Sequence, residues 1–388
     1  MQGFYWTVVL LAILVGHAGL HVAMYNRLNS FGFKRKPVKV ISKVLFFTMI
    51  FVPIVFAAVY FGQLKSMLTG NPDWKLPSPI RAYGWVCLIA WLVLGIPWIV
   101  WRPLLGLEWI RIPRRIRVTD VQAEASNPLS LSPRSRVLSR FPGNQIYTLA
   151  AEELTLPVAG LPRKLDGYRI AHLTDIHLTG HIHGDYTKHV VQVANQWQPD
   201  MMVLTGDIID KLECVDWLHE IFSPAKANDG CYFVLGNHDK RIPDPGLTRD
   251  AMTAAGWTDL GGKVIRTELA GTSVSLLGNE HPWFSRPSEV PQDADFRILL
   301  SHSPDQLPWA RKHNVNLMFA GHTHGGQGRL PIIGPILSPS IHGSRYASGD
   351  FYKSPTTMHV SRGLSGTHLM RINCRPELSL LTLKSPTA

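Results

Sequence analysis

The chain has 388 residues, which is enough for two domains, and its composition is 45% hydrophobic and 17% charged. The net charge of +11 is uneven, because residues 1–145 hold 17 Lys and Arg against 4 Asp and Glu, whereas the remainder holds 22 against 24. A nucleic-acid-binding protein would carry its basic residues on the folded domain, so this distribution argues against nucleic acid as a partner and indicates contact with membrane lipids.

Three uncharged apolar segments are each long enough to cross a hydrocarbon core of about 30 Å as a helix. They are Phe4–Tyr25, Val44–Leu64 and Ala82–Trp101. A cleaved signal peptide is an alternative for the first, but no Lys or Arg precedes it and it is longer than the apolar part of such a peptide. A buried helical hairpin is an alternative for the other two. We therefore predict a membrane region with three transmembrane helices over residues 1–117.

The loop charges predict the orientation of these helices. Six basic residues and no acid lie between the first two segments: Arg27, Lys34, Arg35, Lys36, Lys39 and Lys43. The stretch after the third segment holds Arg102, Arg111, Arg114, Arg115 and Arg117. Because basic loops stay on the cytoplasmic side, we expect a multi-pass protein of the cell's inner (plasma) membrane with a cytoplasmic C-terminal domain. The four Cys are far apart, which fits a reducing compartment without disulfides.

Two histidines in the first apolar segment, His17 and His21, lie four residues apart and hence on one helix face. They could ligate a haem or a metal, but the other segments offer no second pair of ligands. The favoured interpretation is that both rings face neighbouring helices with their nitrogen atoms hydrogen-bonded.

Residues 118–145 are rich in Ser, Pro and Arg and are predicted to be a basic linker between two domains. Its apolar residues could enter the membrane interface while Arg134, Arg136 and Arg140 contact lipid phosphates. An ordinary solvated linker is the open alternative.

From Ile146 onward, short apolar runs alternate with polar residues. The runs are 168–171, 201–204, 231–235, 274–277, 296–300, 315–319, 358–360 and 378–383. Several are too continuous for a half-exposed strand, so they are interpreted as buried strands, with helical patterns at 186–197 and 215–222 between them. We predict an α/β domain over residues 146–388.

Polar motifs follow five of these runs, at the end of the strand where α/β sheets bind ligands. In chain order they are Asp175-Ile176-His177, Gly206-Asp207-Ile208-Ile209-Asp210, Gly236-Asn237-His238-Asp239, Ser301-His302 and Gly321-His322-Thr323-His324. A single Asp-x-His or His-x-His is usually a turn or a surface pair. The five motifs together supply the carboxylate, amide and imidazole ligands that divalent metals take.

The same five motifs resemble, in order, those of the calcineurin-like metallophosphoesterases. The extended form 321–327, Gly-His-Thr-His-Gly-Gly-Gln, is similar to the subgroup of membrane-associated bacterial phosphoesterases, as is the entry segment 161–167. The resemblance covers the chain from about Leu154 to its C-terminus. It implies a four-layer α/β/β/α sandwich and a binuclear metal site.

A two-metal site needs one anionic ligand shared by both ions, and Asp207 is the candidate. Asp175, His177 and His324 would complete the first site, and Asn237, His302 and His322 the second. A water shared by the two ions would lose a proton and attack phosphorus. His238 would then protonate the leaving oxygen, with Asp239 holding its imidazole, and Asp210 would support the site from the second shell.

The expected function is hydrolysis of phosphodiester or pyrophosphate bonds, with two divalent ions (Mn, Fe or Zn) as cofactors. A lipid-linked phosphate ester is the favoured substrate because the site is tethered beside a bilayer. A broad phosphomonoesterase is the alternative within the same chemistry. A non-catalytic membrane scaffold is the third possibility, although a scaffold would have no need of His238 beside intact metal ligands.

Overall fold

The computed structural model describes residues 2–71, 75–95, 108–331 and 333–386, and it contains two compact units, Met1–Leu107 and Glu108–Ala388. The boundaries predicted from the sequence lie at residues 117 and 145. The structure differs because residues 108–145 contribute strands and helices to the second unit, so the predicted linker is part of a folded domain.

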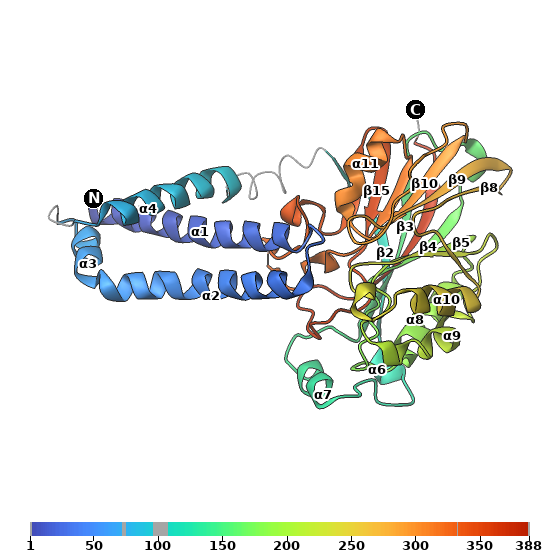
Figure 1. Ribbon diagram of the computed structural model, residues 1–388, viewed down its shortest axis with the longest axis horizontal. Helices are drawn as coiled ribbons and strands as arrows, with labels where there is room; N and C mark the ends of the chain where they lie inside the picture. Colours follow the sequence, from blue (N-terminus) through green and yellow to red (C-terminus); the bar gives the residue numbers. More distant parts are fainter. Residues whose placement is uncertain (1, 72–74, 96–107, 332, 387–388) are drawn as a thin grey trace. The chain divides into compact units, whose positions relative to one another are not determined.

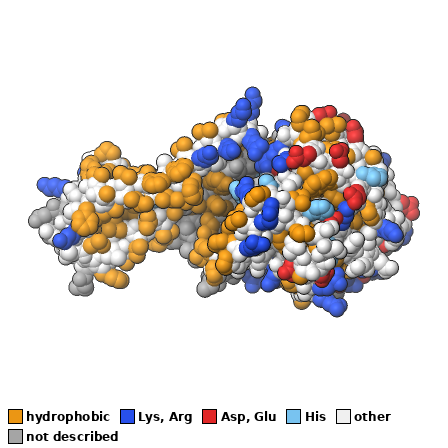
Figure 2. Space-filling view, turned by 90° about the horizontal axis from the view of Figure 1, so that it is seen from below, with side chains coloured by type: hydrophobic (Ala, Val, Ile, Leu, Met, Phe, Trp, Pro, Cys, Tyr) orange, Lys and Arg blue, Asp and Glu red, His pale blue; other side chains and the backbone are white. Residues whose placement is uncertain are grey.

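The first unit is helical. It consists of α1 (Gln2–Leu28), α2 (Arg35–Val59), α3 (Phe61–Thr69), α4 (Ser78–Ala90) and a π-helical turn at Trp91–Gly95. Three helical stretches, Gln2–Leu28, Arg35–Val59 and Ser78–Gly95, are long and apolar enough to cross a membrane. Hydrophobic side chains cover most of their visible surface (Figure 2), as expected for helices that face lipid rather than water.

The helix bounds differ in two ways from the predicted spans. Helix α2 begins at Arg35, so the basic residues from Arg35 to Lys43 lie in its first turns rather than in a loop, and it ends at Val59 before the short α3. The end of the third predicted span, residues 96–101, lies outside the described residues.

His17 of α1 is hydrogen-bonded to two neighbouring helices, in agreement with the favoured interpretation, whereas the bond of His21 stays within its own helix. His17 Nδ1 lies 2.6 Å from the Tyr83 hydroxyl of α4, and its Nε2 lies 3.2 Å from the Met49 carbonyl of α2. His21 Nδ1 lies 2.8 Å from the His17 carbonyl. Both nitrogens of His17 are thus bonded, and among the described residues neither ring belongs to a group of three or more side chains that could hold a metal ion.

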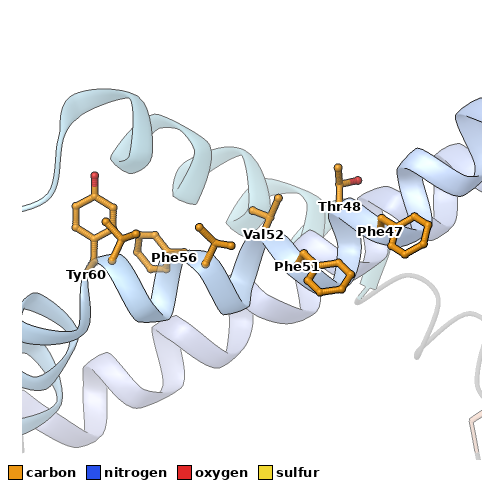
Figure 3. Close-up of a pocket in the computed structure, with 8 residues that line it drawn as sticks. Phe47, Thr48, Phe51, Val52, Phe56 and Tyr60 are labelled. Carbon is orange, nitrogen blue, oxygen red and sulfur yellow. The ribbon is translucent and has the colours of Figure 1, made fainter.

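One apolar groove runs along α2 (Figure 3). Its lining comes from that helix and the residue that ends it: Phe47, Thr48, Phe51, Val52, Val55, Phe56, Val59 and Tyr60. None of these lining residues carries a carboxylate, imidazole or thiol, so the groove offers no side chain for phosphate chemistry.

The second unit is built on two seven-stranded sheets. One sheet has the order β1-β14-β15-β11-β10-β9-β8 and the other β2-β3-β16-β4-β5-β6-β7. The strands of the first are β1 (Trp109–Ile110), β8 (Val264–Leu269), β9 (Thr272–Asn279), β10 (Phe296–Ser301), β11 (Leu317–Ala320), β14 (Gly349–Lys353) and β15 (Thr356–Val360). Those of the second are β2 (Arg114–Asp120), β3 (Thr148–Pro157), β4 (Arg169–Leu173), β5 (Met201–Thr205), β6 (Cys231–Val234), β7 (Trp257–Asp259) and β16 (Glu377–Lys384). A small pair, β12 (Arg329–Leu330) and β13 (Gly334–Pro335), stands apart.

The two sheets pack face to face, with helices on the outside (Figure 1). A central apolar core takes side chains from both sheets, among them Ile170 and Val203 from one and Ile298 and Phe319 from the other. A second core lies under α8 (Asp185–Gln196), α9 (Trp217–Phe222) and α10 (Gly246–Ala254), and a third lies beside α11 (Leu307–Lys312). Short helices α6 (Val121–Glu124) and α7 (Pro133–Ser139) follow β2. The expected α/β class and four-layer α/β/β/α arrangement are confirmed.

Strands β2, β3 and β16 of the second sheet carry an ion-pair network that was not predicted from the sequence. Arg114 of β2 contacts Glu152 at 2.7 Å and Glu377 at 3.4 Å, and it also pairs with Asp350. Arg362 pairs with the same two glutamates. Arg114 was counted among the loop charges after the third apolar segment, but its guanidinium is held by carboxylates of the second unit.

Candidate metal centre

Parallel strands deliver the predicted ligands to one place. Strands β4, β5 and β6 run parallel in one sheet, and β10 and β11 run parallel in the other. Asp175 and His177 follow β4, Asp207 follows β5, Asn237 follows β6, His302 follows β10, and His322 and His324 follow β11. The carboxyl ends of the parallel strands therefore meet at one edge of the sandwich, where α/β proteins bind their ligands.

The backbone at this edge adopts a conformation that side chains other than glycine rarely take. Positive φ angles occur at Asp175 (52°), His177 (50°), Asp207 (54°), His322 (68°) and His324 (50°). Each such residue costs on the order of 1–3 kcal/mol, and strain of this kind concentrates at functional sites. These turns accompany the convergence of the five side chains at that edge of the sandwich.

Two motif glycines leave room for the carboxylates. A Cβ at position 236 would overlap Asp207 Oδ1, and a Cβ at position 321 would overlap Asp175 Oδ2. Any larger residue at either position would push a carboxylate out of the cluster, which explains why glycine precedes Asn237 and His322.

The first group of ligand atoms comes from Asp175, His177, Asp207 and His324, which lie within 4.8 Å of one another. His177 Nε2 lies 3.4 Å from Asp207 Oδ2 and 3.3 Å from His324 Nε2. His324 Nε2 lies 3.5 Å from Asp175 Oδ1. These are the four residues that the sequence analysis assigned to the first metal.

The second group comes from Asp207, His302 and His322, again within 4.8 Å. His302 Nε2 lies 3.3 Å from Asp207 Oδ2, 3.1 Å from His322 Nδ1 and 3.0 Å from Asn237 Oδ1. These are the residues assigned to the second metal, and Asp207 belongs to both groups as expected.

The donor set fits divalent cations. His302 Nδ1 donates to the Thr205 carbonyl at 2.7 Å, since a carbonyl can only accept, so its Nε2 faces the cluster and would present a lone pair there once a cation takes the place of the proton. Asp207 Oδ2 and His322 Nε2 are buried without a hydrogen-bond partner. Burial lowers the pKa of His302, but the Asp207 carboxylate outweighs this effect and raises the pKa to about 9. A space lined by lone pairs and carboxylates attracts positive charge, and mixed oxygen and nitrogen ligands suit Mn, Fe or Zn.

His238 lies beside the first group and is held by Asp210. Its Nδ1 is 2.6 Å from Asp210 Oδ1, and its ring centre is 4.5 Å from that of His177. The other oxygen of Asp210 is 2.8 Å from His177 Nδ1. Burial alone would raise the pKa of Asp210, but the two imidazoles lower it far below its usual value. One ionised carboxylate thus orients both a candidate ligand and the candidate acid.

Asp239 does not hold the imidazole of His238, contrary to the sequence-based expectation. Its carboxylate accepts backbone N–H bonds from Ile208 and Ile209 at 3.0 Å and from Gly236 at 2.7 Å. Burial raises the pKa of Asp239 to about 7. Its role is to tie the turn after β6 to the turn after β5, so it fixes the positions of Asn237 and Asp207.

Sequence reasoning missed three residues around the site. Arg241 donates to His238 Nε2 at 2.7 Å and also contacts Asp210. Trp283 lies against His322, with ring centres 4.8 Å apart. Arg371 is fully buried and bonds to the carbonyl oxygens of Arg362 and Ser365, in the loop whose Ser365 N–H bonds to the Asp175 carbonyl. Only Arg241 had a usable signal, because it lies two residues beyond the motif at 236–239.

Comparison with known proteins decides the family. The family model described as "Calcineurin-like phosphoesterase" matches residues 168–326, which contain all five motifs. A metallophosphoesterase of Bacillus subtilis, YkuE, is 32% identical over 255 residues, which cover 62% of this chain and 87% of the relative. The chain belongs to the calcineurin-like metallophosphoesterases. It is therefore a metal-dependent phosphoric ester hydrolase.

Two further relatives of this metallophosphoesterase have named activities. The phosphodiesterase YaeI of Escherichia coli is 26% identical over 56% of this chain and 82% of its own length. The UDP-2,3-diacylglucosamine pyrophosphatase LpxG of Chlamydia muridarum is 25% identical over 57% of this chain and 86% of its own length. One relative is thus named for a phosphodiester and the other for a lipid-bearing pyrophosphate.

Proposed function

We propose that the protein is a membrane-anchored two-metal hydrolase that cleaves phosphodiester or pyrophosphate bonds in a lipid-linked substrate. The observation that carries this proposal is the position of Asp207, whose carboxylate lies within 4.8 Å of the ligand atoms of two separate groups. A carboxylate in that position can serve two cations at once, which is the arrangement that clamps both the attacking and the leaving oxygen of a phosphoryl group.

The protein's own residues would divide the work as follows. Asp175, His177 and His324 hold one cation, Asn237, His302 and His322 hold the other, and Asp207 is shared. Two divalent ions held there would supply charge neutralisation for the phosphate and a water of lowered pKa. His238, oriented by Asp210, would donate a proton to the leaving oxygen as the imidazolium, a form that burial disfavours in the substrate-free site by lowering the pKa of the ring to about 4. Arg241 lies on the same imidazole, where its charge can contact a substrate phosphate.

Two observations favour a lipid-linked phosphodiester or pyrophosphate over a soluble monoester. The same chain carries three helices with the length and apolar character of membrane spans. Its relatives include proteins named as a phosphodiesterase and as a pyrophosphatase of a diacylated sugar nucleotide. A site tethered to a bilayer meets lipid-borne phosphates at high local concentration, whereas a soluble ester gains nothing from the tether.

The substrate class can be tested with the full chain reconstituted in liposomes. We expect turnover of a diacylated nucleotide pyrophosphate or a lipid phosphodiester, with Mn²⁺, Fe²⁺ or Zn²⁺, at a higher kcat/KM than turnover of bis(p-nitrophenyl) phosphate. A phosphomonoester such as p-nitrophenyl phosphate is the matched comparison. Faster turnover of the monoester than of every diester and pyrophosphate would favour the broad phosphomonoesterase instead.

The catalytic unit is proposed to lie in the cytoplasm, with the N-terminus across the inner membrane. The basic residues from Arg27 to Lys43 and those after the third helix support this orientation, since positive loops stay inside. Without Arg114, which is paired inside the catalytic unit, Arg102, Arg111, Arg115 and Arg117 still follow that helix.

Topology reporters provide a direct test. Alkaline phosphatase fused after Ala388 should be inactive, and green fluorescent protein fused there should be fluorescent. The same two reporters fused at Gly70 test the side of the membrane on which the loop between α3 and α4 lies. We expect Gly70 on the outer side. An active alkaline phosphatase at Ala388 would reverse the proposed orientation and leave the hydrolase assignment intact.

A further inference from the structure

Helix α7 and its flanks expose an unusual mixture of side chains. Val137 is 71% exposed, Phe141 is 53% exposed and Leu131 is 43% exposed. Arg134, Arg136 and Arg140 are exposed between them. No Asp or Glu occurs between Glu124 and Glu152 in the sequence, so no acid in this stretch offsets the three positive charges. The segment Leu131–Phe141 is called the basic-apolar segment below.

This segment has a fixed structure. Ser132 caps α7 by accepting from the Ser135 N–H at 3.1 Å, and the Ser135 hydroxyl returns a bond to the Ser132 backbone. Leu129 and Ser135 are buried and Leu138 packs against the core, so the helix has an inner face. Helix α7 stands away from the layer formed by α8, α9 and α10 (Figure 1). The exposed apolar residues therefore belong to an ordered outer face and not to an unfolded linker.

The basic-apolar segment is tied to the loops that bear the metal ligands. On one side, Leu131 N–H bonds to the His181 carbonyl at 3.0 Å and the Ser132 hydroxyl lies 2.9 Å from His181 Nδ1. His181 follows the Asp175 and His177 turn by four residues.

On the other side, the Asn144 amide donates to both the Leu138 carbonyl at 2.7 Å and the Leu369 carbonyl at 2.9 Å. Ile372, three residues further on, bonds through its N–H to the carbonyl of Gln327, which follows His324. The segment is thus bonded directly to the loop after His177, and indirectly, through Asn144 and residues 369–372, to the loop after His324.

We propose that the basic-apolar segment is a docking surface for an anionic lipid bilayer and that docking presents the metal centre to the headgroup layer. This inference deepens the proposed function and rests on it for the lipid substrate. Apolar side chains flanked by arginines are the composition that inserts into the headgroup region, with the guanidinium groups on lipid phosphates.

The occupant is a bilayer because one is within reach. Only residues 96–107 separate the third apolar helix from the catalytic unit, and a chain of that length spans at most roughly 45 Å when fully extended. A bilayer crossed by those helices would therefore be tethered to the catalytic unit through this short stretch. An acidic protein surface and a second copy of the chain are the other possible occupants, and the experiment separates them.

The test places an environment-sensitive fluorophore on the segment in the full-length protein. Val137→Cys, labelled with nitrobenzoxadiazole and reconstituted in nanodiscs, should give blue-shifted emission in discs with 30% phosphatidylglycerol compared with phosphatidylcholine alone. Nitroxide-labelled lipids should quench it, and high salt should reverse the shift because screening weakens the arginine contacts. The four native Cys are buried, and the parent chain carried through the same labelling measures any background.

Matched variants give the outcome its meaning. Leu247→Cys, at an exposed apolar position of α10 between Asp244 and Asp250, should show no change with lipid composition. Val137→Cys combined with Arg134→Gln, Arg136→Gln and Arg140→Gln should lose most of the shift. Equal emission at position 137 in both kinds of disc, or a shift that depends only on protein concentration, would overturn the proposal, since the latter indicates a second copy.

The readout is independent of catalysis. Hydrolysis of a soluble diester by the unmodified full-length protein tests the metal centre separately. A lipid-dependent emission shift without any hydrolysis would therefore contradict the proposed function and support the docking surface. Hydrolysis without an emission shift would support the proposed hydrolase activity and contradict the docking surface.

Discussion

Replacing Asp207 with Asn is expected to abolish hydrolysis and to lower metal content from the proposed two ions per chain to below one. The carboxylate lies in both ligand groups, with Oδ2 at 3.4 Å from His177 Nε2 and 3.3 Å from His302 Nε2. An amide nitrogen in that place carries no charge and offers no lone pair, so both cations lose a ligand and the charge that offsets their mutual repulsion.

The variant should still fold, which makes metal loss interpretable. Asp207 Oδ1 accepts the His238 backbone N–H at 2.7 Å, and the Asn oxygen can keep that bond. The Asn NH₂ group can donate to the neighbouring imidazole nitrogens. Elemental analysis and circular dichroism of purified protein measure both effects, and Asp216→Asn, an isosteric change at an exposed position, is the control. Retention of two ions by Asp207→Asn would show that the carboxylate is not shared.

The sequence predicted the strands of the catalytic unit well where burial was continuous. Runs such as 201–204 and 231–235 became β5 and β6, all of whose residues are buried. The same patterning gave the site, because strand ends in a parallel sheet converge whatever the intervening loops do. This is why ligands as far apart as Asp175 and His324 could be grouped without a structure.

Strands β2 and β3 were missed because their polar residues are paired in three dimensions. Glu152 is 2% exposed in the middle of β3, and it is stabilised there by Arg114 and Arg362. A glutamate at a core position breaks the apolar pattern, and its partner Arg362 is 210 residues away in the sequence. Arg114 looked like a loop charge for the same reason: a lone basic residue gives no indication of a distant acid.

The assignment of a partner to His238 shows a second limit. Asp239 is adjacent in sequence and Asp210 is 28 residues away, yet the imidazole bonds to Asp210. After β6 the chain enters a short 3-10 turn, which directs the Asp239 side chain back to the backbone N–H groups of neighbouring strand ends. The direction of a side chain in a turn depends on φ and ψ, and motif spacing does not specify these angles.

Replacing His238 with Ala is expected to lower kcat by about 10²–10⁴-fold while both metals stay bound, which is the range for a positioned proton donor. The ring is not a member of either ligand group that contains Asp207, although its ligand atom also lies within 4.8 Å of those of His177 and Asp210. Asp210 would keep its contacts with His177 and Arg241, so the first metal group should remain ordered. The measurement is kcat for diesters with leaving groups of graded pKa, alongside elemental analysis.

The dependence on the leaving group identifies the role of the imidazole. A nitrophenolate departs without protonation, whereas an alkoxide needs a proton, so the loss in His238→Ala should be largest for alkyl esters and small for nitrophenyl esters. Asp210→Asn should show the same trend with a smaller loss, because the ring would remain but lose the carboxylate that orients it. An equal loss across all leaving groups would contradict proton donation. It would instead indicate that His238, together with Arg241 on its Nε2, orients the phosphate.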